Sequence, residues 1–136
     1  MLDWIHKILV CPTCDEPLGI TDGQPGGVDS VSCAICSRTY DAPNGILRFV
    51  PSEDYWQNFG YQWTHFARTQ IDTFSGSTES LDRFKSETGW TPEKLRDKLV
   101  LDVGSGAGRF ADVALRFGAR VVAVDASTSV DACKKN

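Results

Sequence analysis

The chain has 136 residues, of which 41% are hydrophobic and 24% charged, and this ordinary composition of a folded domain excludes a disordered or fibrous chain. No apolar run approaches the roughly 20 residues needed to cross a bilayer, and residues 1–10 lack the basic start and cleavage site of a secretory signal, so we expect a cytoplasmic protein without a membrane partner. The formal net charge is −4 and Lys and Arg form no cluster, which argues against a nucleic-acid partner bound through its phosphates.

Four of the five cysteines form two close pairs after a short apolar segment. Leu2, Ile5 and Leu9 share one helical face and predict a short helix over residues 2–9. In a reducing compartment, paired cysteines indicate metal ligands rather than disulfides, and the 18 residues between these two C-x2-C pairs are typical of tetrahedral zinc. The expected zinc ligands are Cys11, Cys14, Cys33 and Cys36. The alternative is four ordinary reduced cysteines.

Two short strands joined by a turn are expected at residues 18–21 and 28–32, and a further strand pair at residues 38–41 and 46–50 around Pro43-Asn44-Gly45. A module of about fifty residues with so little apolar content is too small for burial alone to hold its fold. Structural zinc contributes on the order of 10 to 16 kcal/mol in small fingers, and four thiolates leave no open position for a substrate. We therefore interpret residues 1–50 as a zinc-ribbon domain with a structural metal.

An aromatic segment opens the second part of the chain, a linker expected over residues 51–98. Residues 55–66 carry six aromatic side chains in twelve positions, and such a segment must pack against something. We expect either a bridge between the flanking domains or a lid over a cofactor, with Tyr61 and Trp63 as the residues to test. His65 stands alone among aromatic residues, and we assign it no role.

Two helices are expected later in this linker. Leu81 and Phe84 lie on one face of an amphipathic helix over residues 78–88, which Gly89 can end. Thr91 as a cap and Pro92 in the first turn predict the start of another helix.

Residues 99–110 predict a strand buried on both faces, a glycine-spaced turn and the start of a helix. The glycines let the backbone approach a ligand closely, and the N-terminus of a helix offers free N–H groups to an anionic group. A second buried strand is expected over residues 120–124, directly before Asp125. The Ser127-Thr128-Ser129 cluster can cap a final helix that reaches Lys134 or Lys135.

The D-x-G-x-G-x-G loop and the acid after the second strand together resemble the first two motifs of class I S-adenosylmethionine-dependent methyltransferases. A dinucleotide fingerprint would require a third glycine where Arg109 stands, which disfavours a nicotinamide-dependent oxidoreductase. The resemblance implies that the loop lies against the methionine part of S-adenosylmethionine and that Asp125 holds its ribose. The expected cofactor-binding residues are Asp102, Gly104, Ser105, Gly106, Gly108, Asp125 and Ala126.

The first fifty residues resemble the small zinc-ribbon proteins that activate methyltransferases, in the pattern L-x-x-I-L-x-C-P-x-C and in the closing Tyr40 to Ile46. A ribbon before the cofactor motif is also similar to bacterial ribosomal-RNA guanine methyltransferases and to enzymes that methylate sugars or secondary metabolites. The resemblance implies a methyltransferase with a small-molecule or sugar-like acceptor. The alternatives are a ribosomal-RNA methyltransferase and a non-enzymatic ribbon module that activates a separate methyltransferase.

The methyltransferase sheet has seven strands, and residues 99–136 match its first two. The expected fold is therefore α/β, with a zinc ribbon at 1–50, a linker or lid at 51–98 and the first part of a Rossmann-like sheet at 99–136. We name no catalytic base and expect the chain alone to be inactive. Its open strand edges predict a homo-oligomer or association with the rest of the methyltransferase domain. Cys133 is expected in the last helix rather than as a fifth metal ligand.

Overall fold

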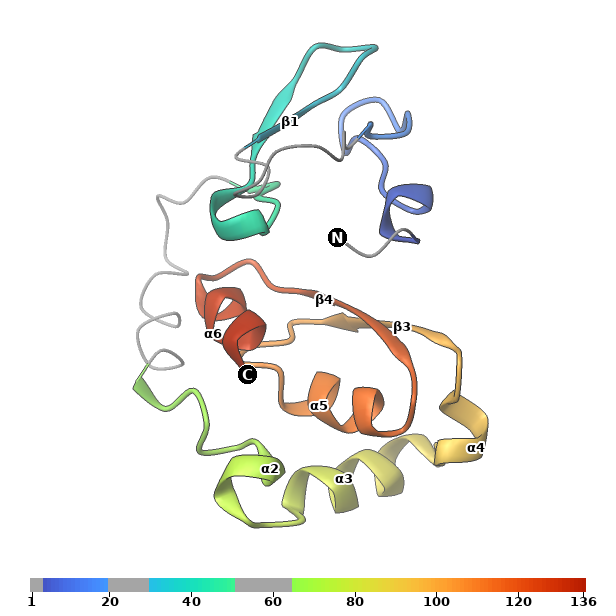
Figure 1. Ribbon diagram of the computed structural model, residues 1–136, viewed down its shortest axis with the longest axis vertical. Helices are drawn as coiled ribbons and strands as arrows, with labels where there is room; N and C mark the ends of the chain where they lie inside the picture. The colour runs from blue at the N-terminus through green and yellow to red at the C-terminus, as the bar shows by residue number, and fades with distance from the viewer. Residues whose placement is uncertain (1–3, 20–29, 51–64) are drawn as a thin grey trace. The chain divides into compact units, whose positions relative to one another are not determined.

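The computed structural model describes residues 4–19, 30–50 and 65–136. The chain divides into two compact units, Met1–Pro51 and Ser52–Asn136. Helices and strands are mixed, and the described strands form two small two-stranded sheets (Figure 1). Among these residues no helix has the length and apolar character needed to cross a membrane. Tyr61, Trp63 and most of the predicted aromatic segment lie outside the described residues, as do residues 20–21 and 28–29 of the predicted strands.

The first unit contains short elements only. The predicted helix over residues 2–9 is reduced, where it is described, to one 3-10 turn, η1 (Ile5–Lys7). The strands are β1 (Ser30–Ser32) and β2 (Thr39–Asp41), which pair antiparallel with Val31 opposite Tyr40. A second 3-10 turn, η2 (Pro43–Gly45), follows β2.

The predicted pairing of residues 38–41 with residues 46–50 is wrong. Residues 46–50 form no strand, and β2 pairs with β1 instead. Between residues 41 and 46 the chain forms the 3-10 turn η2, in which Asn44 and Gly45 have φ of 55° and 70°. Leu18 was expected in a strand as well, but its segment makes a single bridge between Val10 and Pro17.

Where it is described, the second unit follows the predicted order of elements, with a further helix before them. The predicted helices and strands are all present, and the short helix α2 precedes them. In chain order the elements are α2 (Asp72–Ser75), α3 (Glu79–Thr88), α4 (Pro92–Leu95), β3 (Leu99–Val103), α5 (Arg109–Arg116), β4 (Arg120–Val124) and α6 (Ser129–Lys135).

The parallel pair β3–β4 is joined through α5, which packs between this sheet and α3 (Figure 1). The two strands run in register from Leu99 opposite Arg120 to Val103 opposite Val124. The core beneath them consists of side chains from α3, α4, α5 and the turn after α5. Its members are Phe84, Leu95, Val113, Ala114, Phe117 and Ala119, with Val100 and Val121 packed against them from the sheet. These contacts fix the end of β3 relative to the start of α5.

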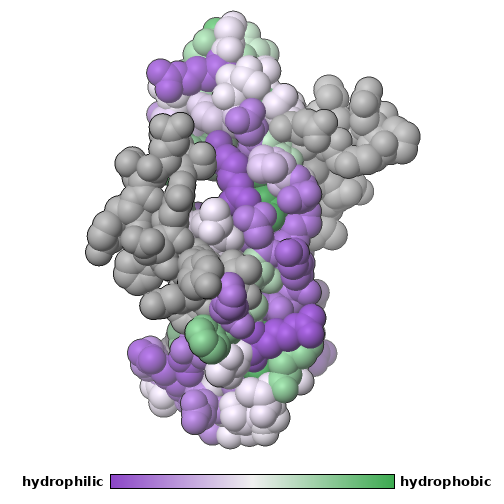
Figure 2. Space-filling view, turned by 90° about the vertical axis from the view of Figure 1, so that its left-hand side faces the viewer, coloured by the Kyte–Doolittle hydropathy of each residue, from purple (hydrophilic) through white to green (hydrophobic). Residues whose placement is uncertain are grey.

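The other face of β3 is exposed among the described residues, although its apolar sequence is typical of a strand buried on both faces. Leu99, Leu101 and Val103 are 46%, 62% and 74% exposed. Most of the described surface in view in Figure 2 is hydrophilic, with apolar residues scattered over it. The described residues show a two-stranded parallel sheet, and the larger Rossmann-like sheet stays a prediction.

Candidate functional site

Four cysteine sulfurs of the first unit lie within 4.8 Å of one another. The Sγ atoms of Cys11 and Cys36 are 3.6 Å apart, and those of Cys14 and Cys33 are 3.5 Å apart. None of the four forms a disulfide. Four thiolates around a zinc ion, at about 2.3 Å each, lie about 3.8 Å apart, so the set is close enough to hold a metal such as zinc. The four cysteines are those of the two predicted pairs.

The two cysteine pairs, 22 residues apart, lie in two turns that are built in the same way. We call these turns, residues 11–18 and 33–40, the two knuckles. In each knuckle the first cysteine uses both its N–H and its carbonyl to bond backbone groups just beyond the second cysteine. These bonds run from Cys11 N to Glu16 O (2.8 Å), Asp15 N to Cys11 O (2.8 Å), Cys33 N to Arg38 O (2.8 Å) and Ser37 N to Cys33 O (3.0 Å). Each knuckle is therefore closed by its own backbone, which fixes the positions of its two sulfurs.

The knuckles also share a left-handed residue after the second cysteine. Asp15 has a φ of 60° and Ser37 a φ of 58°. Seven residues after the first cysteine of each knuckle comes a buried side chain, Leu18 in one and Tyr40 in the other. The sequence analysis missed this internal repeat because neither left-handed position is a glycine and the two buried residues differ in chemistry.

Hydrogen bonds lower the pKa of both buried thiols. Burial raises the pKa of Cys11, but the Tyr40 hydroxyl and the backbone N–H groups of Thr13 and Cys14 outweigh it and bring the pKa to about 6. The backbone N–H groups of Cys36 and Ile35 lower the pKa of Cys33 in the same way. The half-buried Cys14 shifts the other way: the backbone N–H of Glu16 lowers its pKa, but burial and the neighbouring thiols outweigh it and raise that pKa to about 12.

The glycine turn of the second unit links β3 to α5 through a backbone conformation that favours glycine. Gly104, Gly106 and Gly108 have φ of 76°, 53° and 93°, in the region that side chains disfavour. The N–H groups of Gly104 and Ser105 donate to the carbonyl of Val124 at 2.8 and 3.1 Å, which ties the turn to the end of β4. A Cβ built on Gly104 would meet no atom within 4 Å. The first glycine therefore borders open space that a ligand can enter.

Ser105 contributes a buried polar atom to this turn. Only 7% of the residue is exposed, and its hydroxyl has no nitrogen or oxygen partner among the described residues, although the thiol of Cys133 interacts with it. A buried hydroxyl in this position is a group that a polar ligand can satisfy. Ala126, the last residue predicted at this site, is exposed directly after Asp125.

Asp125 is brought against the glycine turn. Its Oδ2 accepts the N–H of Gly106 at 2.8 Å, and its Oδ1 accepts the N–H and the hydroxyl of Ser127 at 2.8 and 2.7 Å. Burial raises the pKa of this carboxyl, but these hydrogen bonds outweigh it and hold the pKa below its usual range. Asp125 therefore presents an ionised carboxylate that joins the turn to the segment before α6.

Asp102 is the half-buried fourth residue of β3. It lines a cavity of about 160 Å³ together with Phe84, Trp90 and Phe110. Burial raises its pKa, and the charge of Asp125 adds to this effect, while the backbone N–H of Ala111 opposes it. The two acids of the motif thus have opposite pKa shifts.

No family model, curated protein or solved structure matches this chain. The functional argument rests on the cysteine tetrad and on the glycine turn with its two acids.

A hydrogen-bond network that the sequence analysis missed anchors the other side of the turn. Arg109, in the position of the absent third glycine, donates from Nε to Ser80 Oγ at 3.0 Å. The Ser80 hydroxyl donates to the carbonyl of Gln70 at 2.7 Å. Asp72 accepts the backbone N–H groups of Ser80 and Leu81 at 3.0 and 2.8 Å. Arg109 therefore connects the start of α5 to the start of α3, and His65, exposed at the edge of the described residues, takes no place in this network.

Gly104 and Gly108 are expected to respond differently to alanine. A Cβ on Gly108 would lie 2.8 Å from Cys133 Sγ, whereas one on Gly104 meets nothing, and both substitutions share the cost of a left-handed backbone. We expect Gly104→Ala to lower the free energy of unfolding by about 1 to 2 kcal/mol and Gly108→Ala by about 2 to 4 kcal/mol. Urea denaturation measures both. Adding Cys133→Ala should restore part of the free energy of unfolding that Gly108→Ala removes, and none of what Gly104→Ala removes. An equal response of both glycine variants to Cys133→Ala would contradict the close contact between Gly108 and Cys133.

Proposed function

We propose that this chain is the S-adenosylmethionine-binding part of a methyltransferase whose first unit is a zinc ribbon. The observation that carries the proposal is the glycine turn between β3 and α5, with three left-handed glycines and with Asp125, which directly follows the parallel strand β4, bonded to its centre. Open space beside Gly104 and the buried Ser105 hydroxyl both fit a ligand at this turn.

The turn and its acids would contact different parts of the cofactor. The backbone from Gly104 to Gly108 would lie against the methionine part, with Asp102 supporting the start of α5. Asp125 would hold the ribose, since Oδ2 accepts one N–H and a carboxylate oxygen can accept two hydrogen bonds. S-adenosylmethionine, when bound, supplies an electrophilic methyl group. The residues of this chain would bind and orient it, which is the positional part of catalysis. The acceptor we propose is a small or sugar-like molecule.

The zinc ribbon is proposed as a structural element. Four thiolates complete a tetrahedral site, so the metal would have no open position for a water or a substrate. Its contribution would be to the stability of the first unit.

A second candidate is a non-enzymatic ribbon module that binds a separate methyltransferase. The uncovered face of β3, with Leu101 and Val103 exposed, favours this alternative because such a face can pack against another protein. Cofactor binding separates the two candidates. Calorimetric titration of the 136-residue chain with S-adenosylhomocysteine should give binding under the first proposal and none under the second.

Asp125→Ala is the specific test of the ribose contact. Loss of a charge-assisted hydrogen-bond pair should weaken S-adenosylhomocysteine binding by about 1.5 to 3 kcal/mol, which is roughly tenfold or more. Because Asp125 also holds Gly106 and Ser127, the same titrations should use the analogue that lacks both ribose hydroxyls. The chain should prefer the intact ribose, and the variant should lose that preference.

Glu93→Ala is the matched control, since Glu93 is an exposed acid of α4, before the start of β3, whereas the turn follows the end of that strand. It should leave both affinities unchanged. If Asp125→Ala weakens the intact ligand and the analogue equally, Asp125 acts on the turn alone and its assignment to the ribose is wrong.

A further inference from the structure

Tyr40 reaches the cysteine tetrad from the opposite knuckle. Its hydroxyl oxygen lies 3.1 Å from Cys11 Sγ and 3.2 Å from Thr13 Oγ1. The residue is at the centre of β2, only 8% exposed, and its ring packs edge-on against Phe49 at a centroid distance of 5.1 Å. The ring is therefore held by packing, and the hydroxyl is directed at one sulfur.

A bound metal would fix the direction of these hydrogen bonds. A metal-bound Cys11 is a thiolate, which has no proton and can only accept. The Tyr40 hydroxyl must then donate to Cys11, and its oxygen is left to accept from the Thr13 hydroxyl. The three groups form a relay in which Thr13 donates to Tyr40 and Tyr40 donates to the sulfur.

The internal repeat supplies a comparison within the same metal centre. Leu18 stands in the first knuckle where Tyr40 stands in the second, and it is also buried. A leucine has no donor, so Cys33 has backbone N–H groups around it but no hydroxyl relay of the kind that reaches Cys11. The two buried ligands differ by one O–H···S hydrogen bond.

We propose that Tyr40 is a positioning residue of the metal centre, donating a hydrogen bond to the metal-bound Cys11 thiolate with Thr13 as the outer donor, and that it thereby slows metal release and protects Cys11 from electrophiles. The proposal rests on the structural zinc site proposed above. A hydrogen bond draws charge from the sulfur, which makes it a weaker nucleophile while it stays bound, and outer partners of metal ligands contribute substantially to affinity.

Tyr40→Phe tests the relay because phenylalanine keeps the packed ring and removes the hydroxyl. We expect zinc affinity, measured by competition with a chromogenic chelator, to fall by about tenfold to a hundredfold. N-ethylmaleimide labelling of the zinc-loaded chain, followed residue by residue by mass spectrometry, should show faster alkylation of Cys11 and an unchanged rate at Cys33. Thr13→Val should act in the same direction with a smaller effect.

Ser32→Ala is the control, since it removes the exposed 3.0 Å bond between Ser32 and Thr39 in the same sheet and leaves Tyr40, Thr13 and the four cysteines in place. It should match the unsubstituted chain. The proposal is overturned if Tyr40→Phe leaves Cys11 labelling unchanged, or if all four cysteines react faster together with a lower melting temperature, which would mean that Tyr40 only packs. Metal analysis of the unsubstituted chain comes first, and a chain without bound zinc would reject the metal centre itself along with the relay.

Discussion

Removal of metal by a chelator is expected to unfold the first unit and to leave the second folded. The first unit has three-residue strands and a core of Cys11, Leu18, Val31, Cys33 and Tyr40, which includes two of the ligands themselves. Such a core is too small to hold the fold, and a structural zinc ion supplies on the order of 10 to 16 kcal/mol. Amide NMR signals of residues 4–19 and 30–50 should collapse on chelation, while those of residues 65–136 stay dispersed.

Cys33→Ser should have the same effect without a chelator. We expect less than one zinc per chain by metal analysis and loss of the folded signals of the first unit. Cys133→Ser is the matched control, because Cys133 lies in α6 outside the tetrad, and it should keep one zinc and the original signals. A Cys33→Ser chain with full zinc and an unchanged melting temperature would show that the tetrad is not the metal site.

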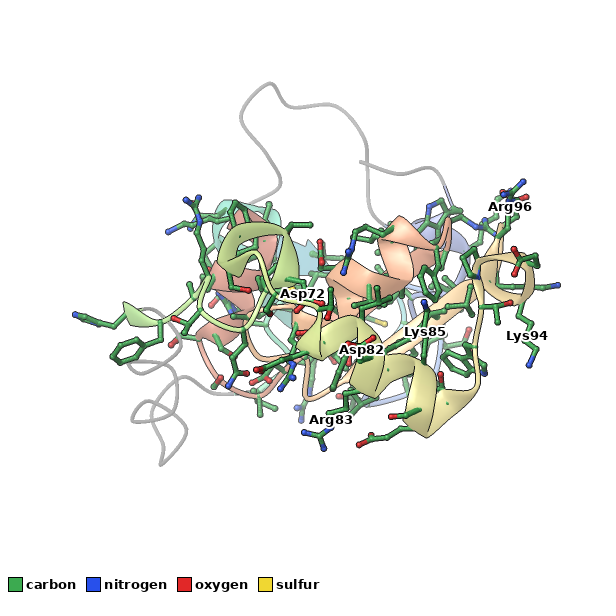
Figure 3. All side chains as sticks on the ribbon, turned by 90° about the horizontal axis from the view of Figure 1, so that it is seen from below. Asp72, Asp82, Arg83, Lys85, Lys94 and Arg96 are labelled. Carbon is green, nitrogen blue, oxygen red and sulfur yellow. The ribbon has the colours of Figure 1, made fainter. Side chains whose placement is uncertain are left out.

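Asp72→Ala is expected to lower the free energy of unfolding of the second unit by about 2 to 4 kcal/mol, measured by urea denaturation. The carboxylate is buried, accepts the first N–H groups of α3, and lies 3.7 Å from the guanidinium of Arg116. Removing it leaves those N–H groups buried without an acceptor. Asp82, on the solvent side of the same helix, is the control, and Asp82→Ala should change the free energy by less than about 1 kcal/mol (Figure 3).

The Asp72 effect should depend on pH. Burial raises the pKa of this carboxyl, but hydrogen bonds from Leu81, Ser80 and Ser77 outweigh it and hold the pKa below its usual range. A pKa that is lower in the folded state adds stability above the unfolded-state value near 3.9, and this stability is lost as the pH falls through the folded-state value. The difference between the chain and Asp72→Ala should therefore shrink below about pH 4. A constant difference down to pH 2 would contradict this role.

Local patterns predicted the second unit well because each element there carries its own signal. The alternation of buried strands with a helical run after Gly108 placed β3, α5 and β4, and Gly89 ended α3 as expected. Asp72 was missed for a physical reason. A capping residue is sought directly before a helix, whereas this acid bonds Ser80 and Leu81 from a separate helix eight and nine residues earlier.

The first unit was harder to predict because its strands are too short to carry a pattern. The ligand set followed from cysteine spacing, which depends on metal geometry alone. The strand pairing depends instead on the turn between β1 and β2, where Ser37 has a left-handed backbone and no glycine indicates it. The hydroxyl of Tyr40 at Cys11 follows from that pairing and could not be found without it.

If the tetrad binds a metal, the two self-closed knuckles would divide its capture into two unequal events. Each knuckle holds its pair of sulfurs through its own backbone bonds, so a metal can first be taken by one pair. The other pair then meets it at an effective concentration set by the chain between Cys14 and Cys33. Because the entropy of closing a loop grows only logarithmically, doubling that chain length costs about 0.6 kcal/mol. The number of residues between the two cysteine pairs would therefore have little effect on metal affinity. The metal affinity would depend mainly on the two eight-residue knuckles.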